Sequence, residues 1–375
     1  MSGIYIHIPF CRKACHYCNF HFSTSQQSRT AMAAAIAKEA VIRKDFITGT
    51  VSTIYFGGGT PSLLTAAELM LMMDIFSSHF SIATDAEITL EANPDDISPD
   101  KLLEWKKAGI NRLSIGIQSF FEEDLQWMNR AHNASQAKNC IQLAQDAGFH
   151  NLTIDLIYGT PGLSNERWIT NIETAISFNI PHLSCYALTV EPNTALDKLI
   201  QKGTKADVDQ QKQAVHFDLL TTRLEAAGFE HYEISNFARP GFRSRHNSSY
   251  WQGKPYLGLG PSAHSFNGSI RQWNISNNAL YLKSIEQDLI PFEAEQLTDE
   301  QQLNEYIMTS LRTMEGCSLE LIEKKWGEKN VSAIKAAAQK YLQEEYLNLS
   351  GNQLILTKKG KFLADGIAAE LFQLN

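Results

Sequence analysis

The chain of 375 residues has 33 basic and 41 acidic side chains, a formal net charge of −8, and 43% apolar residues. This length and apolar content suffice for one large α/β domain with a smaller companion, and the acidic balance without a long basic block argues against a nucleic-acid partner. No apolar run approaches the ~18 residues that cross a bilayer, and the N-terminus does not have the pattern of a secretory signal. We therefore expect a cytoplasmic protein with no transmembrane segment.

The first half of the chain alternates short β-branched runs with helical stretches. The predicted strands are Ile4–Ile8, Thr53–Phe56, Glu87–Glu91, Arg112–Ile117, Asn151–Tyr158 and His182–Thr189. The intervening predicted helices are Ser28–Lys44, Ala66–Ser77, Pro99–Lys107, Ser135–Ala147 and Asn165–Phe178. Repeated βα units with nearly continuous apolar strands predict an α/β fold with a parallel sheet covered by helices, either open or curled into a barrel. Ligands of such folds gather at the carboxyl ends of the strands.

The pattern divides the chain into a core over residues 1–195, an extension over 196–296 and a small domain over 297–375. The extension has one clear helix, Val208–Ala227, followed by a loop-rich stretch whose aromatic content argues against disorder. In the last region Thr298 and Gln301 form a capping box. Two further helices, a hairpin around Ser350–Asn352 and a final helix predict a winged-helix shape. A packing appendage and a binding module remain equally open for this domain.

Three of the six cysteines, Cys11, Cys15 and Cys18, lie in a C-x3-C-x2-C pattern directly after the first predicted strand. A reducing compartment favours a metal site over a set of disulfides. A structural zinc ion needs four ligands, a set that His16 or His21 could complete. Three thiolates on one loop suit instead a four-iron cluster in which one iron has no protein ligand. The other cysteines are scattered and typical of small buried apolar residues: Cys140, Cys185 and Cys317.

Glycine-rich and polar segments follow the later strands. The sequence FGGGTPS, residues 56–62, follows the second strand, where consecutive glycines let the backbone approach a ligand; a simple turn is the alternative. Glu91, Gln118 and Asp155 close successive strands and can accept hydrogen bonds from a ribose, although each alone could be a helix cap or turn residue. Arg130 is either a bidentate partner for a ligand carboxylate or an exposed surface arginine. Together these residues predict a polar ligand at the carboxyl edge of the sheet.

The cysteine spacing after a first strand resembles the signature of the radical S-adenosylmethionine (SAM) superfamily. Phrases from IYIHIPFC to the last helix resemble, within it, the oxygen-independent coproporphyrinogen dehydrogenases and the related HemW-type haem chaperones. The resemblance implies a partial (β/α)6 barrel with a winged-helix-like C-terminal domain, a [4Fe-4S] cluster on the three clustered cysteines, and SAM on its open iron. The positions that match SAM contacts or flank the cluster are Tyr5, Tyr17, Gly58, Gly59, Thr60, Glu91, Gln118, Arg130, Asp155 and Ala187.

Two features separate the two branches of this family. The dehydrogenases resemble C-x3-C-x2-C-x-C and have a long arm before the first strand, whereas this chain has Phe20 in place of the last cysteine and only three residues before its strand. The segment His246-Asn247-x-x-Tyr250 resembles the HNxxY element of the chaperones, which is associated with haem binding. An imidazole is a good axial haem ligand; a loop histidine held by local hydrogen bonds is the alternative.

The expected function is therefore haem binding and transfer of haem to acceptor haem proteins, such as membrane respiratory proteins or bacterioferritin. An electron donor is a further expected partner. The alternative function is that of a coproporphyrinogen III dehydrogenase, in which a radical made from SAM abstracts hydrogen from propionate side chains before decarboxylation. A zinc-stabilised binding module is a third possibility, which the colour of the protein would distinguish.

Overall fold

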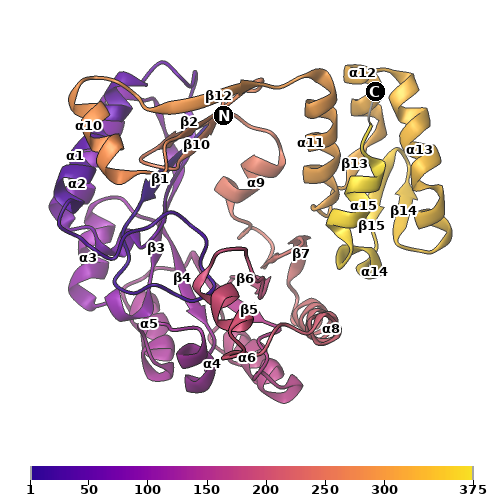
Figure 1. Cartoon of the computed structure of the whole chain (residues 1–375), viewed down its shortest axis with the longest axis horizontal. Helices are drawn as coiled ribbons and strands as arrows, with labels where there is room; N and C mark the ends of the chain where they lie inside the picture. Colours follow the sequence, from indigo (N-terminus) through magenta and orange to yellow (C-terminus); the bar gives the residue numbers. More distant parts are fainter. Residues whose placement is uncertain (1, 374–375) are drawn as a thin grey trace.

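The computed structural model describes residues 2–373, which form a curved mixed sheet with an outer layer of helices and a C-terminal helical domain (Figure 1). Six parallel strands run in chain order through the centre of the sheet. They are β1 (Ser2–Ile8), β2 (Val51–Gly58), β3 (Ile82–Ala92), β4 (Arg112–Gln118), β5 (Leu152–Tyr158) and β6 (His182–Ala187). The six predicted strands are thus confirmed. Because they are parallel, their carboxyl ends meet at one edge of the sheet.

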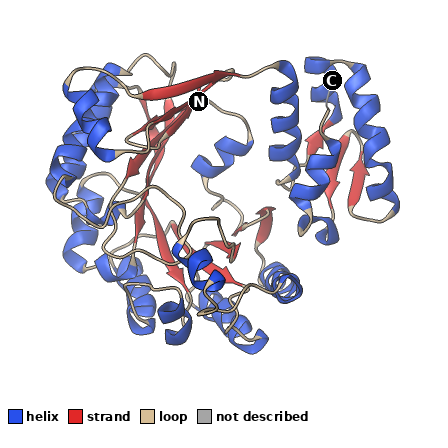
Figure 2. Ribbon diagram, in the orientation of Figure 1, coloured by secondary structure: helices blue, strands red, loops and turns tan. Residues whose placement is uncertain are grey.

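Helices lie on the outer side of the curved sheet, and its concave side faces the C-terminal domain (Figure 2). The outer helices are α1 (Arg29–Ile42), α2 (Ala66–His79), α3 (Pro99–Lys107), α4 (Glu122–Trp127), α5 (Ala134–Asp146), α6 (Asn165–Ser177) and α8 (Gln210–Ala226). Helix side chains such as Ile36 and Trp168 join fully buried strand residues such as Ile54 in one core. Burial of apolar area on this scale drives folding of the sheet and helices as one unit. The expected partial (β/α)6 barrel is confirmed.

The extension over residues 196–296 differs from the expected loop-rich region, because it adds six short strands to the two edges of the sheet. Beside β1 lie β9 (Tyr256–Leu259), β10 (His264–Phe266), β11 (Ile270–Asn274) and β12 (Phe292–Gln296); beside β6 lie β8 (Asn236–Ala238) and β7 (Glu230–Glu233). The same region contributes the helices α7 (Ala195–Gln201), α9 (Arg245–Trp251) and α10 (Asn278–Glu286). Strands of three to five residues are too short to show a two-residue alternation that sequence analysis can detect.

A buried carboxylate, Glu39 of α1, connects the added strands to the barrel. Glu39 accepts hydrogen bonds from the Asn274 amide (2.8 Å), the Tyr281 hydroxyl (2.6 Å) and the backbone N–H of Gly260 (2.8 Å). It also pairs with the buried guanidinium of Arg43 at 3.2 Å. The groups that bind the Glu39 carboxylate therefore come from four places: the end of α1, the end of β9, β11 and α10. The one carboxylate contacts all four.

The C-terminal domain has its own apolar core, which contains Leu303, Ile322 and Ile334 among other residues. Its elements are α11 (Asp299–Leu311), β13 (Cys317–Ser318), α12 (Leu319–Trp326), α13 (Glu328–Gln343), β14 (Leu347–Ser350), β15 (Gln353–Leu356), α14 (Lys358–Lys361) and α15 (Ala364–Leu371). The helix–strand–helix–helix–strand–strand order is that of a winged helix, as expected. The capping box is also present, since Thr298 and Gln301 cap α11 reciprocally.

Ion pairs connect the C-terminal domain to the sheet at two places. Arg271 of β11 pairs with Glu305 of α11, and also with Glu295 at 3.1 Å. Arg312, at the end of α11, donates to Glu233 of β7 at 3.0 Å. These contacts span the concave side of the sheet, so that α9 lies between the sheet and α11 (Figure 1).

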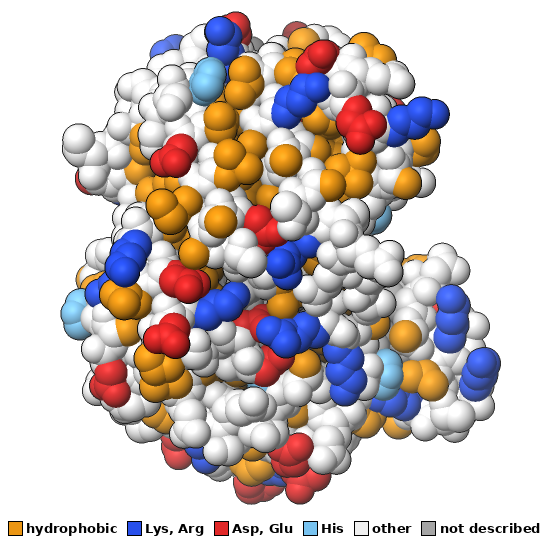
Figure 3. All heavy atoms as spheres, turned by 90° about the vertical axis from the view of Figure 1, so that its left-hand side faces the viewer, with side chains coloured by type: hydrophobic (Ala, Val, Ile, Leu, Met, Phe, Trp, Pro, Cys, Tyr) orange, Lys and Arg blue, Asp and Glu red, His pale blue; other side chains and the backbone are white. Residues whose placement is uncertain are grey.

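The outer face of the barrel carries basic, acidic and apolar side chains intermixed (Figure 3). Exposed apolar residues include Met70 and Leu71 of α2 and Leu103 of α3. Such singly exposed apolar residues are common on protein surfaces. Within residues 2–373, none of the helices combines the length and the apolar character that crossing a membrane would demand.

Replacement of Glu39 by Ala is expected to lower the free energy of unfolding by about 3 to 5 kcal/mol, because Arg43 would remain buried without its counter-charge. Urea denaturation followed by circular dichroism measures this change. The matched control is Glu173→Ala, which removes an exposed ion pair with Arg223 and should cost no more than about 1 kcal/mol. Equal effects of the two substitutions would contradict the role given to Glu39.

Candidate metal and cofactor site

The three clustered cysteines lie on the loop that leaves the carboxyl end of β1. The loop is tied to itself, since the N–H of Cys11 donates to the carbonyl of Ser23 at 3.0 Å and that of Cys18 to the carbonyl of Cys15 at 3.3 Å. All three thiols are free and half-buried. Burial above all, with smaller contributions from the neighbouring Cys18 and Cys15 thiols, raises the pKa of Cys11 to about 11, although the hydrogen bond from Thr60 lowers it. Three free, half-buried thiols on one loop fit the ligand set of an iron–sulfur cluster.

Residues from the loops that follow β2 and α4 contact the cysteine sulfurs. The Thr60 hydroxyl lies 3.5 Å from Cys11 Sγ, and Arg130 Nη1 lies 3.3 Å from Cys15 Sγ. Donors of this kind stabilise thiolate charge and tune a metal cluster. Arg130 also donates from Nη1 to the Tyr17 hydroxyl (3.3 Å) and from Nη2 to Asn93 Oδ1 (2.6 Å). Its buried Nε has no partner among the described residues, which leaves a donor for a ligand beside the cysteine loop.

Steric constraints explain why glycines occupy positions 58 and 59 at the end of β2. A side chain on Gly59 would come within 2.7 Å of the backbone oxygens of Ile8 and Phe10, and Gly58 has a φ of +102°. Neither position tolerates a Cβ. The glycines therefore let the second loop pack directly against the cysteine loop, and contact between these glycines and SAM stays a prediction.

Glu91 and Asp155 stand half-buried on the concave side of the sheet. Burial raises the pKa of Glu91 to about 8, with repulsion from Asp155 acting in the same direction, although the Tyr55 hydroxyl donates to Glu91 at 2.8 Å and lowers it. Burial likewise raises the pKa of Asp155 to about 6, against the effect of Arg112. Near pH 7 Glu91 is then mostly protonated and Asp155 mostly ionised, so the pair can both donate hydrogen bonds to and accept them from a hydroxyl-bearing ligand.

The remaining predicted contacts lie at the same edge of the sheet. Gln118 ends β4 with a φ of +64°, and a Cβ on Gly116 would meet both the Gln118 amide (3.0 Å) and Arg130 (3.1 Å), so these two side chains converge above that glycine. Ala187 is the last residue of β6. The β1 residue Tyr5 donates to, or accepts from, His7 Nδ1 at 3.2 Å. The predicted SAM residues therefore lie along the carboxyl ends and the concave face of the six strands.

The segment with His246 and Tyr250 forms the short helix α9 rather than a loop. Glu87 of β3 accepts the backbone N–H groups of Arg245 (3.1 Å) and His246 (3.0 Å) and so fixes the start of this helix. The His246 ring is buried, with Nδ1 2.8 Å from the Thr53 hydroxyl and Nε2 2.7 Å from the Tyr250 hydroxyl. Burial lowers its pKa to about 3, so the ring is neutral. Both nitrogens are occupied, which differs from the open imidazole expected of an axial ligand.

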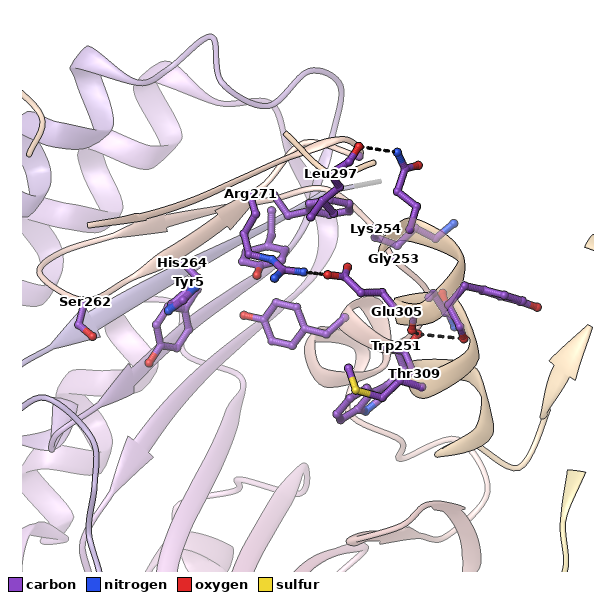
Figure 4. Close-up of a pocket in the computed structure, with 18 of the residues that line it drawn as sticks. Tyr5, Trp251, Gly253, Lys254, Ser262, His264, Arg271, Leu297, Glu305 and Thr309 are labelled. Carbon is purple, nitrogen blue, oxygen red and sulfur yellow. Dashed lines mark hydrogen bonds and ion pairs between the residues drawn. The ribbon is translucent and has the colours of Figure 1, made fainter. Parts of the chain in front are cut away.

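A cavity of about 730 Å³ lies between the sheet, α9 and the C-terminal helices α11 and α12. Figure 4 shows Tyr5 and His264 on the sheet side of this cavity and Glu305 and Thr309 on the side of α11. This cavity could not be predicted from the sequence, because its walls come from segments as distant as residues 5 and 326. Phe20 lies two residues after Cys18, is 64% exposed and lines the cavity. The cavity therefore begins beside the predicted cluster ligands.

Comparisons with known proteins agree with this geometry. The model of the radical SAM superfamily matches residues 5–175, and that of the HemN C-terminal domain matches residues 297–363. The solved structure of coproporphyrinogen III oxidase (HemN) from Escherichia coli superimposes with a TM-score of 0.86 over 99% of this chain and 90% of the other, at 23% identity, and so has the same fold. The three-cysteine loop on a partial (β/α)6 barrel therefore defines a radical SAM protein, which implies a [4Fe-4S] cluster and SAM.

Similar proteins of known name identify the family within this superfamily. It is 35% identical over 376 residues to the heme chaperone HemW of Mycobacterium tuberculosis, covering 98% of this chain and 94% of the relative. It is 33% identical to the heme chaperone HemW of Bacillus subtilis, covering 98% of both chains. The chain belongs to the HemW family.

Single replacements of Cys11, Cys15 or Cys18 by Ala are expected to reduce the iron and sulfide bound after anaerobic reconstitution from about four of each per chain towards zero. The loop position of these thiols means that circular dichroism should remain that of the native fold. Cys317→Ala is the matched control, since this thiol is buried in the C-terminal core and should not affect iron content. Full iron content in a Cys15→Ala variant would exclude Cys15 as a ligand.

The affinity for SAM is expected to rise with pH between 6 and 8, by at most about tenfold per pH unit, because Glu91 is ionised only above its pKa of about 8. An ionised carboxylate attracts the positively charged SAM and accepts hydrogen bonds from its hydroxyls. Calorimetric titration of the reconstituted protein at several pH values measures this dependence. The Glu91→Gln variant carries no charge here, so its titrations correct for protonation of SAM itself. Identical pH profiles in both proteins would contradict the prediction.

Proposed function

We propose that this protein is a haem chaperone, which binds haem and delivers it to acceptor haem proteins. The observation that supports this most directly is the cavity beside the cysteine loop, which lies in a chain whose full-length relatives are curated as heme chaperones. Its volume of about 730 Å³ is within the range of cofactor pockets. Aromatic side chains such as Trp251 and Trp326 line it, as a flat apolar macrocycle requires.

The charges around the cavity also suit haem, whose two propionates are anionic. The cavity is lined by the cations Lys254, Arg271 and Lys325 and by one carboxylate, Glu305. Arginine and lysine are the usual partners of carboxylates at binding sites. Resemblance to the family adds the predicted haem residues His246, Asn247 and Tyr250, of which Tyr250 lines the cavity.

The proposal assigns the cysteine loop and the SAM residues to a supporting role. A bound [4Fe-4S] cluster with SAM would supply electron transfer or SAM cleavage next to the cavity. In this chain the residues Thr60 and Arg130 hold the thiolates of Cys11 and Cys15, and Phe20 gives the cavity an apolar wall where the dehydrogenases have a cysteine. Coproporphyrinogen III dehydrogenation is the less favoured function for this reason. The acceptor proteins, the electron donor and a cytoplasmic location stay predictions.

The protein loaded with haem is expected to transfer it to the apo form of a haem protein such as bacterioferritin. The transfer is measured by the absorption spectrum of the separated acceptor, and haem-loaded serum albumin serves as the control for passive exchange. Transfer no faster than from albumin would contradict the chaperone function.

The same preparation should not convert coproporphyrinogen III to protoporphyrinogen IX when supplied with SAM and reductant under anaerobic conditions. A HemN-type coproporphyrinogen III oxidase assayed in parallel shows that the assay works. Product formation by this protein would overturn the proposal in favour of porphyrin synthesis.

A further inference from the structure

We infer that haem binds in the cavity between the sheet and the C-terminal domain, with His264 as an axial iron ligand and His246 as a positioning residue behind Tyr250. This inference rests on the proposed function and adds to it the location of the haem and the identity of the ligand. It follows from the hydrogen bonds of the histidines, the pleat of β10 and the lining of the cavity.

The histidines near the cavity differ in which ring nitrogens are free. His7 has both nitrogens engaged, with Nδ1 3.2 Å from the Tyr5 hydroxyl and Nε2 2.8 Å from the carbonyl of His21. His21 has its Nε2 2.8 Å from Asn278 Oδ1, which leaves only its Nδ1 without a hydrogen-bond partner among residues 2–373. His264 is exposed to the cavity, and among residues 2–373 neither of its nitrogens has a hydrogen-bond partner. A haem iron needs a free imidazole nitrogen, which His264 supplies without breaking any contact.

The pleat of β10 directs His264 into the cavity. Side chains alternate along a strand, so His264 and Phe266 share one face while Ser265 lies on the other. Ser265 is buried, and its hydroxyl accepts from Arg43 at 3.1 Å and from the backbone N–H of Gly258 at 2.9 Å. These bonds fix the register of β10, because a shift by one residue would bury the imidazole and expose the serine.

The position of β10 is also fixed by a backbone contact. A Cβ on Gly258 would lie 1.9 Å from the carbonyl oxygen of His264, so only glycine allows β9 and β10 to approach this closely. The His264 ring stacks on Trp273, its cross-strand partner on β11, with ring centroids 6.2 Å apart. The imidazole is thus supported by a packed aromatic ring, as a ligand of defined orientation requires.

The opposite wall and the rim of the cavity fit the rest of a haem molecule. Tyr306 and Trp326 of α11 and α12 stack on each other, with centroids 5.8 Å apart, and provide an apolar wall. Lys254 and Lys325 form no ion pair within the described part of the chain and remain available for propionates. These features correspond to the parts of iron protoporphyrin: the apolar walls suit the macrocycle, the free imidazole suits the iron, and the free cations at the rim suit the propionates.

His246 has a different role in this arrangement. Its Nε2 holds the Tyr250 hydroxyl at 2.7 Å, and its Nδ1 is anchored to Thr53. Tyr250 packs edge-on against Tyr256, with centroids 4.6 Å apart, and both rings line the cavity. His246 therefore sets the position of a wall of the pocket and does not contact the iron, so its replacement should weaken haem binding without removing imidazole ligation.

The test titrates haem into the reconstituted full chain and records affinity together with electron paramagnetic resonance and resonance Raman signatures of imidazole ligation. His264→Gly is expected to bind haem at least about tenfold more weakly and to lose these signatures. Addition of imidazole to its haem complex should restore them, because the small ligand can occupy the vacated space. His246→Ala should retain the signatures with reduced affinity, and His79→Ala, an exposed histidine on α2, is the matched control.

The outcomes separate this inference from the proposed function. Wild-type protein that binds no haem would remove the chaperone function itself. Haem binding by His264→Gly with wild-type affinity and signatures would overturn the inference and leave the chaperone function intact. Loss of imidazole ligation in His21→Ala or His246→Ala, with His264→Gly unaffected, would assign the ligand elsewhere and also overturn it. A ligation change confined to His264→Gly, with rescue by imidazole, supports it.

Discussion

The burial of Glu39 is the constraint on which the second half of the molecule depends. A buried carboxylate is tolerated only with its full set of partners, and those of Glu39 come from α1, the end of β9, β11 and α10. The charge thereby holds four segments from both halves of the chain in one arrangement. Together with the pairing of β9 with β1, it holds the strands that extend the barrel beyond β1. Their concave face is the wall from which Tyr256, His264 and Arg271 project into the cavity.

The barrel and the cysteine loop could be predicted from the sequence because their signals are local. A continuous apolar run such as Leu152–Tyr158 indicates a buried parallel strand by itself, and three cysteines within eight residues indicate a cluster without reference to other segments. The added strands could not be predicted in this way. A segment such as His264–Phe266 becomes a strand through pairing with β9 and β11 and not through its own propensity. The cavity, which needs these strands and the C-terminal domain together, was therefore not foreseen.

The HNxxY segment shows the limit of a motif more sharply. Its residue types predict a haem contact, which stays a prediction, and the sequence does not contain the direction in which α9 points. That direction is set by Glu87, 158 residues away from the helix, which binds its first N–H groups and turns His246 towards Thr53. A helix of seven residues has little stability of its own and adopts the orientation that its partners impose. The side chains that a motif brings to a surface are consequently a property of the whole fold.

Arg271 takes part in the contact between the sheet and the C-terminal domain and also lines the cavity. Its guanidinium joins β11 to α11 through an ion pair with Glu305, and the same side chain lines the cavity between the sheet and the C-terminal domain. A carboxylate ligand that engaged Arg271 would compete with Glu305 for one cation and would weaken one of the two ion-pair contacts between the sheet and the C-terminal domain. By reciprocal linkage, a partner that pulls this domain away weakens the hold on the ligand. Under the proposed chaperone function, this shared guanidinium would couple docking of an acceptor protein to release of haem.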